Sequence, residues 1–411
     1  MVKKLSRIRK VAVFTGNRAE YGLLFPVLRA IQKHSELEFK LIVSGAHLDQ
    51  NFGSTLNEIL NDGFVIESEI KIEMDASSVI ATPMAIGSGI LEISKVLKNL
   101  NPDLMVVYAD RFEGFAAVIA ATQMNIPTAH IEGGDITEGG ALDDSVRHAM
   151  TKLSHIHFTT NEQATNRVLA MGEEIWRVHT VGFPAIDLIT ESNYATPEEI
   201  KKKYGLDINR PIALYTQHSI TTESEKAGKQ VEPSIDALKK LATSGVQVVV
   251  TYANNDVGGK FINEKLEILK KQNFPNIQIQ ISLGRYFYHG ILALARLEDT
   301  KIVCVGNSSS GLKETPVFGC PTVNIGSRQE GRLRGVNVLN VGYRSEEIYD
   351  AIIKCLYDQD FRETARTTFN PYWLGDAGTK IANVLASIPL GEKLLRKKMT
   401  LKGELRNGWF R

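Results

Sequence analysis

The fold class is decided by Val11-Ala-Val-Phe-Thr-Gly16 and the residues that follow it. This short apolar run contains β-branched residues and is typical of a buried strand, and Gly16 permits a tight turn. Beyond the turn, Leu24, Val27 and Ile31 recur at helical spacing. The segment therefore predicts a strand, a turn and a helix, which is the unit from which parallel α/β sheets are built.

The same alternation of apolar runs and helical patterns continues along the chain, without a tandem repeat. Further strand-like runs in the first half are residues 39–44, 64–70, 104–108, 127–131, 156–159 and 178–182. Those in the second half are residues 211–216, 246–252, 277–281, 301–305, 321–325 and 336–341. The pattern predicts an α/β protein with two doubly wound, Rossmann-like domains.

A polar stretch, residues 191–209, separates the two groups of strands and contains Pro197 and three consecutive lysines. This composition indicates a linker, so we expect an N-terminal domain over 1–190 and a C-terminal domain over 205–370. Two such domains are expected to face a cleft, in which ligands lie beyond the carboxyl ends of the strands.

The end of the chain has two expected parts. A helical pattern at 379–388 lies within the segment 371–390, and a basic tail spans 391–411. From Lys393 onward this tail has seven basic residues against one acid, Glu404. We expect a solvated end rather than a membrane or nucleic-acid arm.

Composition narrows the function classes. The 48 Lys and Arg residues balance 47 Asp and Glu residues, which argues against nucleic acid as the main partner. No apolar run approaches the length that spans a membrane, and the one after the basic first ten residues is too short for a signal peptide. The three cysteines have no close spacing, so we expect free thiols, no metal site and a cytoplasmic protein.

The most informative segment is Val305-Gly-Asn-Ser-Ser-Ser-Gly-Leu-Lys-Glu314, which follows a predicted strand and opens a predicted helix. Small residues allow backbone N–H groups to approach an anion, and Ser308 and Ser309 add hydroxyl donors, so the segment resembles a diphosphate cradle. Glu314 is placed to accept hydrogen bonds from ribose hydroxyls. The alternative is an ordinary Gly/Ser loop with a capping serine.

Polar residues follow other predicted strands. Arg18, after the first strand, is a candidate for holding phosphate, with a surface arginine as the alternative. His218 ends the first strand of the second domain, and a histidine donates to phosphate or transfers protons near neutral pH. Asn254 and Asp256 follow another strand and offer polar groups to a ligand, although alone they indicate a turn.

Acidic clusters also lie at strand ends. Asp110 stands beside Arg111 and Glu113, Glu132 ends an apolar strand, and Asp143 precedes a helical run. Carboxylates gathered with cations suit general acid and base catalysis, because neighbouring charges and burial separate their pKa values. Helix capping is the alternative for Asp143 or its neighbour.

Together these segments resemble the hydrolysing UDP-N-acetylglucosamine 2-epimerases, including the bacterial enzymes that make N-acetylmannosamine for sialic-acid synthesis. Two of the matching motifs are His130-Ile-Glu-Gly-Gly134 and Gly306-Asn-Ser-Ser-Ser-Gly311. The others are residues 15–22, 44–47, 109–113, 143–148, 151–154, 217–218, 326–332 and 370–372. Asp135 and the stretch 135–142, which would lie against the sugar, depart from the pattern of some members.

The resemblance implies a glycosyltransferase-B-like fold in which the helix in 371–390 crosses back to the first domain. It implies four catalytic residues: Asp110, Glu132, Asp143 and His218. It implies that Arg328 holds the diphosphate or uridine. The full set of residues implied to hold the substrate is Arg18, His47, Arg111, Asn254, Asp256, Ser308, Ser309, Glu314 and Arg328. Neither a cofactor nor a metal is implied, and relatives form homodimers or homotetramers.

The implied reaction is elimination of UDP from UDP-N-acetylglucosamine to 2-acetamidoglucal, followed by addition of water to give N-acetylmannosamine. The C2 proton is not acidic, so its removal must be coupled to departure of UDP. Related enzymes that act on UDP-2,4-diacetamido-2,4,6-trideoxy sugars for legionaminic-acid synthesis would share these motifs. A glycosyltransferase and a catalytically silent sugar-nucleotide sensor are the alternatives from other classes.

Overall fold

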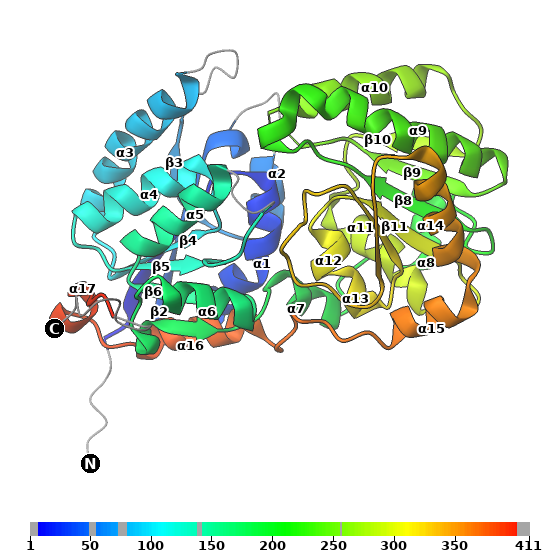
Figure 1. Ribbon diagram of the computed structural model, residues 1–411. Helices are drawn as coiled ribbons and strands as arrows, with labels where there is room; N and C mark the ends of the chain where they lie inside the picture. Colours follow the sequence, from blue (N-terminus) through cyan, green and yellow to red (C-terminus); the bar gives the residue numbers. More distant parts are fainter. Residues whose placement is uncertain (1–6, 49–54, 73–79, 138–141, 255–256, 401–411) are drawn as a thin grey trace, which may run out of the picture. The chain divides into compact units, whose positions relative to one another are not determined.

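The computed structural model describes residues 7–48, 55–72, 80–137, 142–254 and 257–400. The chain forms two compact units (Figure 1). Unit 1 comprises Met1–Asp135, Asp143–Asp187 and Leu374–Arg411, and unit 2 comprises Ile136–Leu142 and Leu188–Trp373. Each unit is an α/β fold around a parallel sheet, so the expected fold class of two doubly wound domains is confirmed.

Unit 1 contains a seven-stranded sheet in the order β3-β2-β1-β4-β5-β6-β7. Its strands are β1 (Arg9–Thr15), β2 (Leu37–Ser44), β3 (Ile66–Ile70), β4 (Leu104–Tyr108), β5 (Thr128–Ile131), β6 (Ile156–Thr159) and β7 (Val178–Thr180). The pairs are parallel, and Tyr108 at the end of β4 lies opposite Ile131 at the end of β5. The carboxyl ends of β4 and β5 are therefore neighbours.

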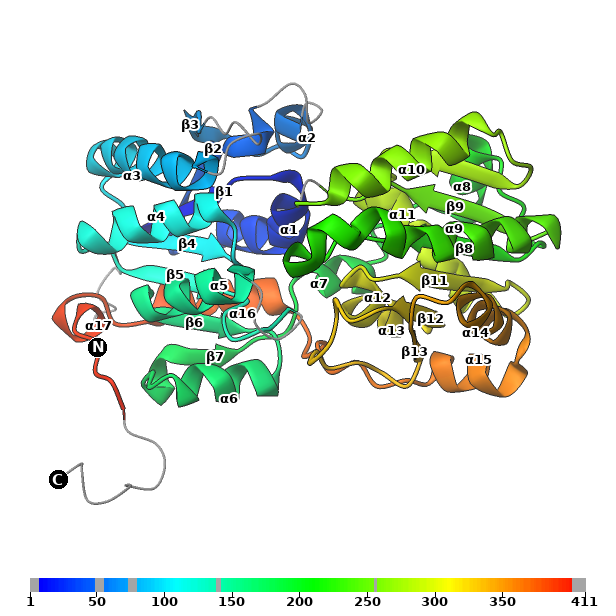
Figure 2. The ribbon, with the colours of Figure 1, turned by 45° about the horizontal axis from the view of Figure 1, so that its top comes forward.

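Helices cover both faces of this sheet. They are α1 (Arg18–Lys33), α2 (Thr55–Asn61), α3 (Ala81–Leu100), α4 (Phe112–Gln123), α5 (Leu142–Leu153), α6 (Glu162–Ala170), α7 (Ala185–Thr190), α16 (Ala377–Ser387) and α17 (Glu392–Leu395). Helices α3 and α4 lie side by side, and their buried residues join Ala12 and Phe14 of β1 in one core (Figure 2). Helix α16 packs on α1, where Gly378 allows close approach to the carbonyl of Pro26.

Unit 2 contains a six-stranded parallel sheet in the order β10-β9-β8-β11-β12-β13. Its strands are β8 (Ile212–Thr216), β9 (Gln247–Thr251), β10 (Ile277–Gln280), β11 (Ile302–Gly306), β12 (Thr322–Ile325) and β13 (Val338–Val341). Its helices are α8 (Pro197–Tyr204), α9 (Ala227–Thr243), α10 (Gly259–Lys271), α11 (Gly284–Ala293), α12 (Ser310–Lys313), α13 (Thr315–Phe318), α14 (Ser345–Tyr357) and α15 (Gln359–Arg366).

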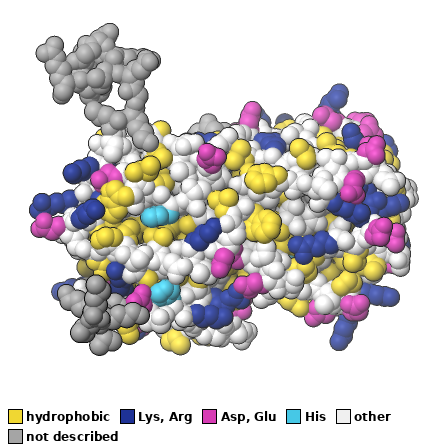
Figure 3. All heavy atoms as spheres, turned by 90° about the horizontal axis from the view of Figure 1, so that it is seen from below, with side chains coloured by type: hydrophobic (Ala, Val, Ile, Leu, Met, Phe, Trp, Pro, Cys, Tyr) yellow, Lys and Arg dark blue, Asp and Glu magenta, His cyan; other side chains and the backbone are white. Residues whose placement is uncertain are grey.

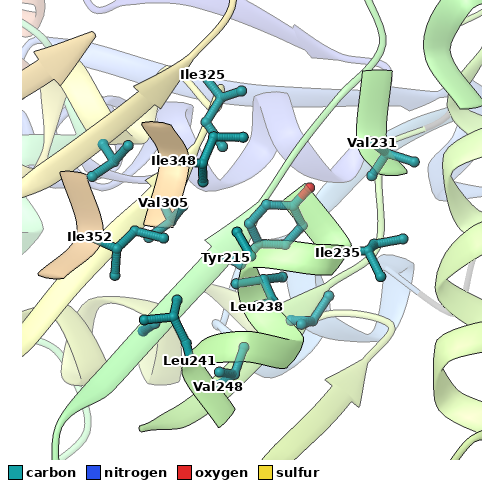
Figure 4. Packing of buried hydrophobic residues seen from close by; sticks show 14 of the residues in the cluster. Tyr215, Val231, Ile235, Leu238, Leu241, Val248, Val305, Ile325, Ile348 and Ile352 are labelled. Carbon is teal, nitrogen blue, oxygen red and sulfur yellow. The ribbon is translucent and has the colours of Figure 1, made fainter. Parts of the chain in front are cut away.

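Alternate residues of the strands in unit 2 face two separate cores, as the period of two in a strand requires. Tyr215 of β8 packs with Leu238 of α9 and Ile348 of α14 on one face (Figure 4). Leu214, the preceding residue, packs on the other face with Ile291 of α11. The central strands β8, β9 and β11 are therefore mostly apolar, because both of their faces are buried along the whole length of each strand.

The chain order reverses at the same place in both sheets. In unit 1 the reversal falls between β1 and β4, and in unit 2 it falls between β8 and β11. Ligands of open α/β sheets bind beyond the carboxyl ends of the strands at such points. The two sheets therefore each present one favoured position for a ligand.

Two expectations about local structure need correction. The stretch 191–209, expected as a linker, holds α8, because Thr196 and Glu199 form a capping box and Ile200 is buried. The single helix expected after Ser308 is two four-residue helices, α12 and α13, with Pro316 in the first turn of α13. Such short helices contribute little dipole to an anion site.

Most residues of the basic tail are exposed over 391–400, as expected of a solvated end, but its backbone is held on unit 1. The buried guanidinium of Arg177 donates to the carbonyl oxygens of Lys393, Leu394 and Arg396 at 2.7 to 3.2 Å. Lys397 pairs with Glu173 at 2.9 Å. These bonds use the carbonyls that a short helix leaves unpaired at its end. Residues 401–411 lie outside the described residues.

The remaining features of the fold concern the helices, the surface charge and the cysteines. Within the part of the chain that the structure describes, none of the helices is long and apolar enough to span a bilayer. Figure 3 shows one face of the molecule, on which cationic and anionic side chains are interspersed. The cysteines are free and buried, and burial raises the pKa of the Cys304 thiol to about 12.

Candidate functional site

The neighbouring ends of β4 and β5 adopt an unusual backbone conformation. Ala109, directly after β4, has φ +52°, and Glu132, directly after β5, has φ +67°. This left-handed region costs a residue with a Cβ atom about 1 kcal/mol or more, and such strain clusters at functional sites. The other non-glycine residues with this conformation in the described ranges are four asparagines and Ser192. Two strained strand ends side by side therefore mark a candidate site.

Asp110 follows the strained Ala109 and forms an ion pair with Arg147 of α5. The same guanidinium lies 3.2 Å from Asp144, and the side chain of Arg147 is buried. Asp143, the residue we expected in a catalytic role, is half-buried in the first turn of α5. The structure therefore joins Asp110 to Asp144 through one shared arginine.

Glu132 is buried beside Tyr108, and the Glu132 carboxylate, after burial itself, raises the pKa of the Tyr108 hydroxyl further above its usual value. The backbone of the neighbouring turn is fixed by His130. Its Nε2 lies 2.7 Å from the carbonyl oxygen of Ala109, and its Nδ1 lies 3.1 Å from Thr151 Oγ1. A carbonyl only accepts, so Nε2 carries the hydrogen, and burial lowers the pKa of His130 to about 3, which keeps the ring neutral.

Two more carboxyl groups, those of Glu20 in α1 and Glu113 in α4, lie against the loop after β1. Gly16 N–H donates to Glu20 Oε2 at 2.7 Å, and burial, assisted by the charge of Glu113, raises the pKa of Glu20 to about 8. A Cβ atom on Gly16 would lie 2.8 Å from Glu113 Cβ, so this glycine is required for close packing. The raised pKa favours the neutral form of the Glu20 carboxyl group, which lies next to the loop after β1.

The remaining predicted residues of unit 1 lie close to the same loops. His47 is buried with its Nε2 3.1 Å from Thr15 Oγ1, and burial lowers its pKa to about 4. Arg111 Nε lies 3.7 Å from the buried Glu113 carboxylate. Arg18 is the first residue of α1, and its side chain lies outside the described part of the structure.

Unit 2 joins the ends of β8 and β11 through Asn307. Its side-chain oxygen accepts from the backbone N–H of His218 at 2.7 Å, and its amide nitrogen donates to the carbonyl of the same residue at 2.9 Å. His218 Nδ1 accepts from the backbone N–H of Asn254 at 3.1 Å, which leaves Nε2 as the donor of a neutral ring. Asp256 lies outside the described residues.

The predicted anion loop is held by the next strand end. Arg328 Nη1 and Gln329 Nε2 donate to the carbonyl of Asn307 at 3.1 and 2.7 Å. Ser308 and Ser309, directly after Asn307, are half-buried. The structure therefore brings these two serines and Arg328 to one edge of unit 2, with His218 held to the same loop.

Glu314 lies within a network of polar side chains in unit 2. Its Oε2 lies 3.0 Å from His289 Nε2 and 2.9 Å from Ser310 Oγ. Burial acts to raise the pKa of Glu314, but the contacts with His289 and Ser310 outweigh it and hold the pKa below its ordinary value. Glu314 is therefore a buried carboxylate, in contrast to the neutral Glu20.

The stretch 135–142 is described in part. Arg332 donates to the carbonyl of Ile136 at 2.5 Å and to Thr137 Oγ1 at 2.9 Å within unit 2. Residues 138–141 lie outside the described residues. In the described ranges the structure has no cluster of three or more His, Cys, Asp or Glu side chains that could hold a metal ion.

Three residues of these sites received no role from the sequence. Arg147 was visible only as a cation after two aspartates, and His130 only as part of a motif, because neither pattern reveals which carboxylate or carbonyl it contacts. His289 is buried in α11, and its only signal was that a buried polar side chain needs a partner.

The chain is similar to known proteins in sequence and in fold. The family described as UDP-N-acetylglucosamine 2-epimerase matches residues 29–386. A Legionella pneumophila protein named UDP-N,N′-diacetylbacillosamine 2-epimerase (hydrolyzing) is 33% identical over 95% of this chain and 99% of its own length. A UDP-N-acetylglucosamine 2-epimerase of Neisseria meningitidis serogroup B is 33% identical over 84% of this chain and 87% of its own length.

A crystal structure of UDP-GlcNAc 2-epimerase from Neisseria meningitidis bound to UDP-GlcNAc has the same fold. It covers 92% of this chain and 99% of its own, with a TM-score of 0.77 and 21% identity.

Proposed function

Because the chain belongs to the UDP-N-acetylglucosamine 2-epimerase family, we propose that it is a hydrolysing 2-epimerase that converts UDP-N-acetylglucosamine and water to N-acetylmannosamine and UDP. The hydrolysing reaction is supported by the name of the Legionella relative. The product would enter sialic-acid-type synthesis.

The observation that carries the proposal is the pair of strained strand ends in unit 1. Ala109 and Glu132 hold left-handed backbone on adjacent strands, and this places Asp110 and Glu132 at one edge of the sheet. Two carboxylates held at one place suit a reaction that must remove a proton from a carbon atom.

We assign the base to Glu132, because Asp110 already shares its charge with Arg147. Glu132 takes the C2 proton, the C2–H electron pair forms the C1=C2 double bond of 2-acetamidoglucal, and the C1–O bond breaks with its electrons leaving on UDP. Water then adds its hydroxyl group to C1 and a proton to C2 from the opposite face. Asp143 and His218 position or protonate in this second step.

The nucleotide is assigned to unit 2. Ser308, Ser309 and Arg328 lie at one edge of its sheet, and Arg18 is assigned to the diphosphate or uridine as well. His218 donates through Nε2 to the leaving phosphate, since its Nδ1 is occupied by Asn254. Glu314 accepts from the ribose, and Asp256, His47 and Arg111 complete the set expected around the substrate. Cationic and N–H donors stabilise the charge that develops on UDP.

A second substrate is favoured by the name of the Legionella relative, which matches nearly the whole chain. This candidate is a UDP-2,4-diacetamido-2,4,6-trideoxy sugar of legionaminic-acid synthesis. The two substrates share the nucleotide and the acetamido group at C2, so the residues above would act on both in the same way.

The test is incubation of the protein with each UDP sugar in D₂O, followed by NMR. The proposal predicts free UDP and a 2-epimerised sugar with deuterium at C2, and the substrate with the larger kcat/KM is the natural one. Epimer that retains UDP would indicate a non-hydrolysing epimerase. UDP binding with no turnover would indicate a sensor, and transfer of the sugar to an added acceptor would indicate a glycosyltransferase. We also expect a homodimer or homotetramer, which light scattering measures.

A further inference from the structure

A histidine outside the expected site contacts one of its members. His289 of α11 is 3% exposed, and its Nε2 lies 3.0 Å from Oε2 of Glu314, which is 7% exposed. The same oxygen lies 2.9 Å from Ser310 Oγ, which in turn lies 3.1 Å from the Tyr288 hydroxyl. Two neighbouring residues of α11 therefore contact the segment that carries Glu314.

The hydrogen bonds to the Glu314 carboxylate have fixed directions. A carboxylate only accepts, so Ser310 Oγ donates to Glu314 Oε2. For the same reason His289 Nε2 carries a hydrogen toward Glu314. Oε2 thus accepts two hydrogen bonds, whereas Oε1 accepts none from the described residues.

We propose that His289 is a positioning residue, which holds Oε2 of Glu314 so that Oε1 is presented, charged and in one orientation, to a ribose hydroxyl of the bound nucleotide. This inference rests on the proposed function, because it takes the nucleotide to lie on unit 2. A charged acceptor forms stronger hydrogen bonds with hydroxyl groups than a neutral one. Burial alone would neutralise such a carboxyl group, as it does at Glu20.

A purely structural role for the pair is the competing explanation, in which His289 only ties α11 to α12. The two explanations differ in what a substitution changes. A structural role affects all ligands and the free energy of unfolding together, whereas a positioning role affects only ligands that carry the ribose hydroxyl.

The test is calorimetric titration of the full chain with UDP, 2′-deoxy-UDP and 3′-deoxy-UDP. The wild-type protein is expected to bind UDP about tenfold more tightly than one of the deoxy analogues, the value of one hydrogen bond to a charged group. The variant His289→Leu should lose this preference by binding UDP about tenfold more weakly and the analogue with unchanged affinity. The variant His289→Gln, whose amide replaces Nε2 as a donor, should keep the preference.

Two further variants control for folding and for histidine loss in general. His289→Asn keeps a polar side chain that is too short to reach Oε2, so it should lose the preference even if His289→Leu does not fold. His179→Leu, in β7 of unit 1, should keep it.

The outcomes separate the two proposals. Wild-type protein that binds no UDP contradicts the proposed function. Wild-type protein that prefers UDP, with His289→Asn or His289→Leu variants that keep the preference, overturns the role of His289 and leaves the proposed function standing. Equal wild-type affinity for UDP and both analogues also overturns it.

Discussion

The two sheets have left-handed backbone at corresponding strand ends, but different residue types adopt it. By their place in the strand order, β4 and β5 of unit 1 correspond to β11 and β12 of unit 2. Each of the four strands has a residue with positive φ at its last position or directly after it: Ala109 and Glu132 in unit 1, Gly306 and Gly326 in unit 2. Unit 1 thus accepts backbone strain at the positions where unit 2 uses glycine.

The reason for the difference lies in what each strand end must hold. A Cβ atom on Gly306 would lie 1.9 Å from the carbonyl oxygen of Thr216, and one on Gly326 would lie 2.1 Å from the Tyr343 hydroxyl. Neither position in unit 2 has room for a side chain. At Glu132 the side chain is the functional group that we assign as the base, so glycine would remove the chemistry together with the strain. Unit 1 therefore keeps a functional side chain at Glu132, where unit 2 has a glycine in close contact with its neighbours.

The first prediction tests whether the side chain of Glu132 in unit 1 acts as the base. The Glu132→Gln variant keeps the shape and the left-handed turn but cannot take a proton. We expect kcat to fall about 10³-fold or more, with UDP affinity changed less than about twofold. Steady-state UDP release and calorimetry measure the two quantities. Glu162→Gln, at an exposed acid of α6, is the control. Turnover within tenfold of wild type would remove Glu132 from the mechanism.

The second prediction tests whether close contact with Thr216 requires a glycine at Gly306 in unit 2. Gly306→Ala adds a Cβ atom against the Thr216 carbonyl, whereas Gly245→Ala, also at positive φ, meets no atom within 4 Å. We expect the free energy of unfolding to fall by about 3 kcal/mol or more for the first variant and by about 1 kcal/mol for the second. Urea unfolding measures both. Equal losses would show that φ alone, and not the close approach, requires glycine at Gly306.

Glu20 in unit 1 and Glu314 in unit 2 are both buried, but they should make stability depend on pH in opposite directions. The pKa of Glu20 is raised by burial to about 8, so its contribution to stability is full below the ordinary value of 4.5 and is lost as the pH rises toward 8. The pKa of Glu314 is lowered, so its contribution is present above 4.5 and is lost as the pH falls through the folded-state pKa. Each glutamine variant removes one of these dependences.

Between pH 5 and pH 8, Glu20→Gln should gain stability relative to wild type by on the order of 2 kcal/mol, less than the full pKa shift implies because buried sites relax when they ionise. Glu314→Gln should be less stable than wild type at pH 7, and this difference should shrink below pH 4.5. Urea unfolding across the pH range measures both curves. Two curves with the same slope would mean that the two carboxyl groups do not differ in charge.

Much of the fold followed from the sequence because both faces of these parallel strands are buried. Apolar runs such as 104–108 and 156–159 coincide with β4 and β6. The positions at which helices begin and end were harder to predict than the strands. The linker prediction for 191–209 missed α8 because a polar composition hides its capping box, and the pattern after Ser308 did not show that two short helices stand where one was expected.

For the site, the sequence could place residues at strand ends but could not pair them. Asp110, Glu132 and Asn254 do follow β4, β5 and β9. The contacts that decide their chemistry come from residues distant in the chain, such as Arg147 for Asp110, 37 positions away. Backbone strain at Ala109 leaves no mark in the sequence, because alanine is common everywhere. The roles of the site residues stay predictions until the variants above are measured.

The smallest expected effect tests whether the strain at β4 is real. Ala109 has φ +52°, and its carbonyl accepts the hydrogen bond from His130 Nε2. The Ala109→Gly variant should remove the Cβ penalty but add unfolded-chain entropy, so we expect a net gain in stability of about 0.5 kcal/mol. At Ala149, inside α5 at ordinary helical φ, the same replacement should cost about 1 kcal/mol. If both variants lose the same stability, the turn at Ala109 is unstrained, and strain at the strand ends of unit 1 no longer distinguishes a catalytic edge from an ordinary one.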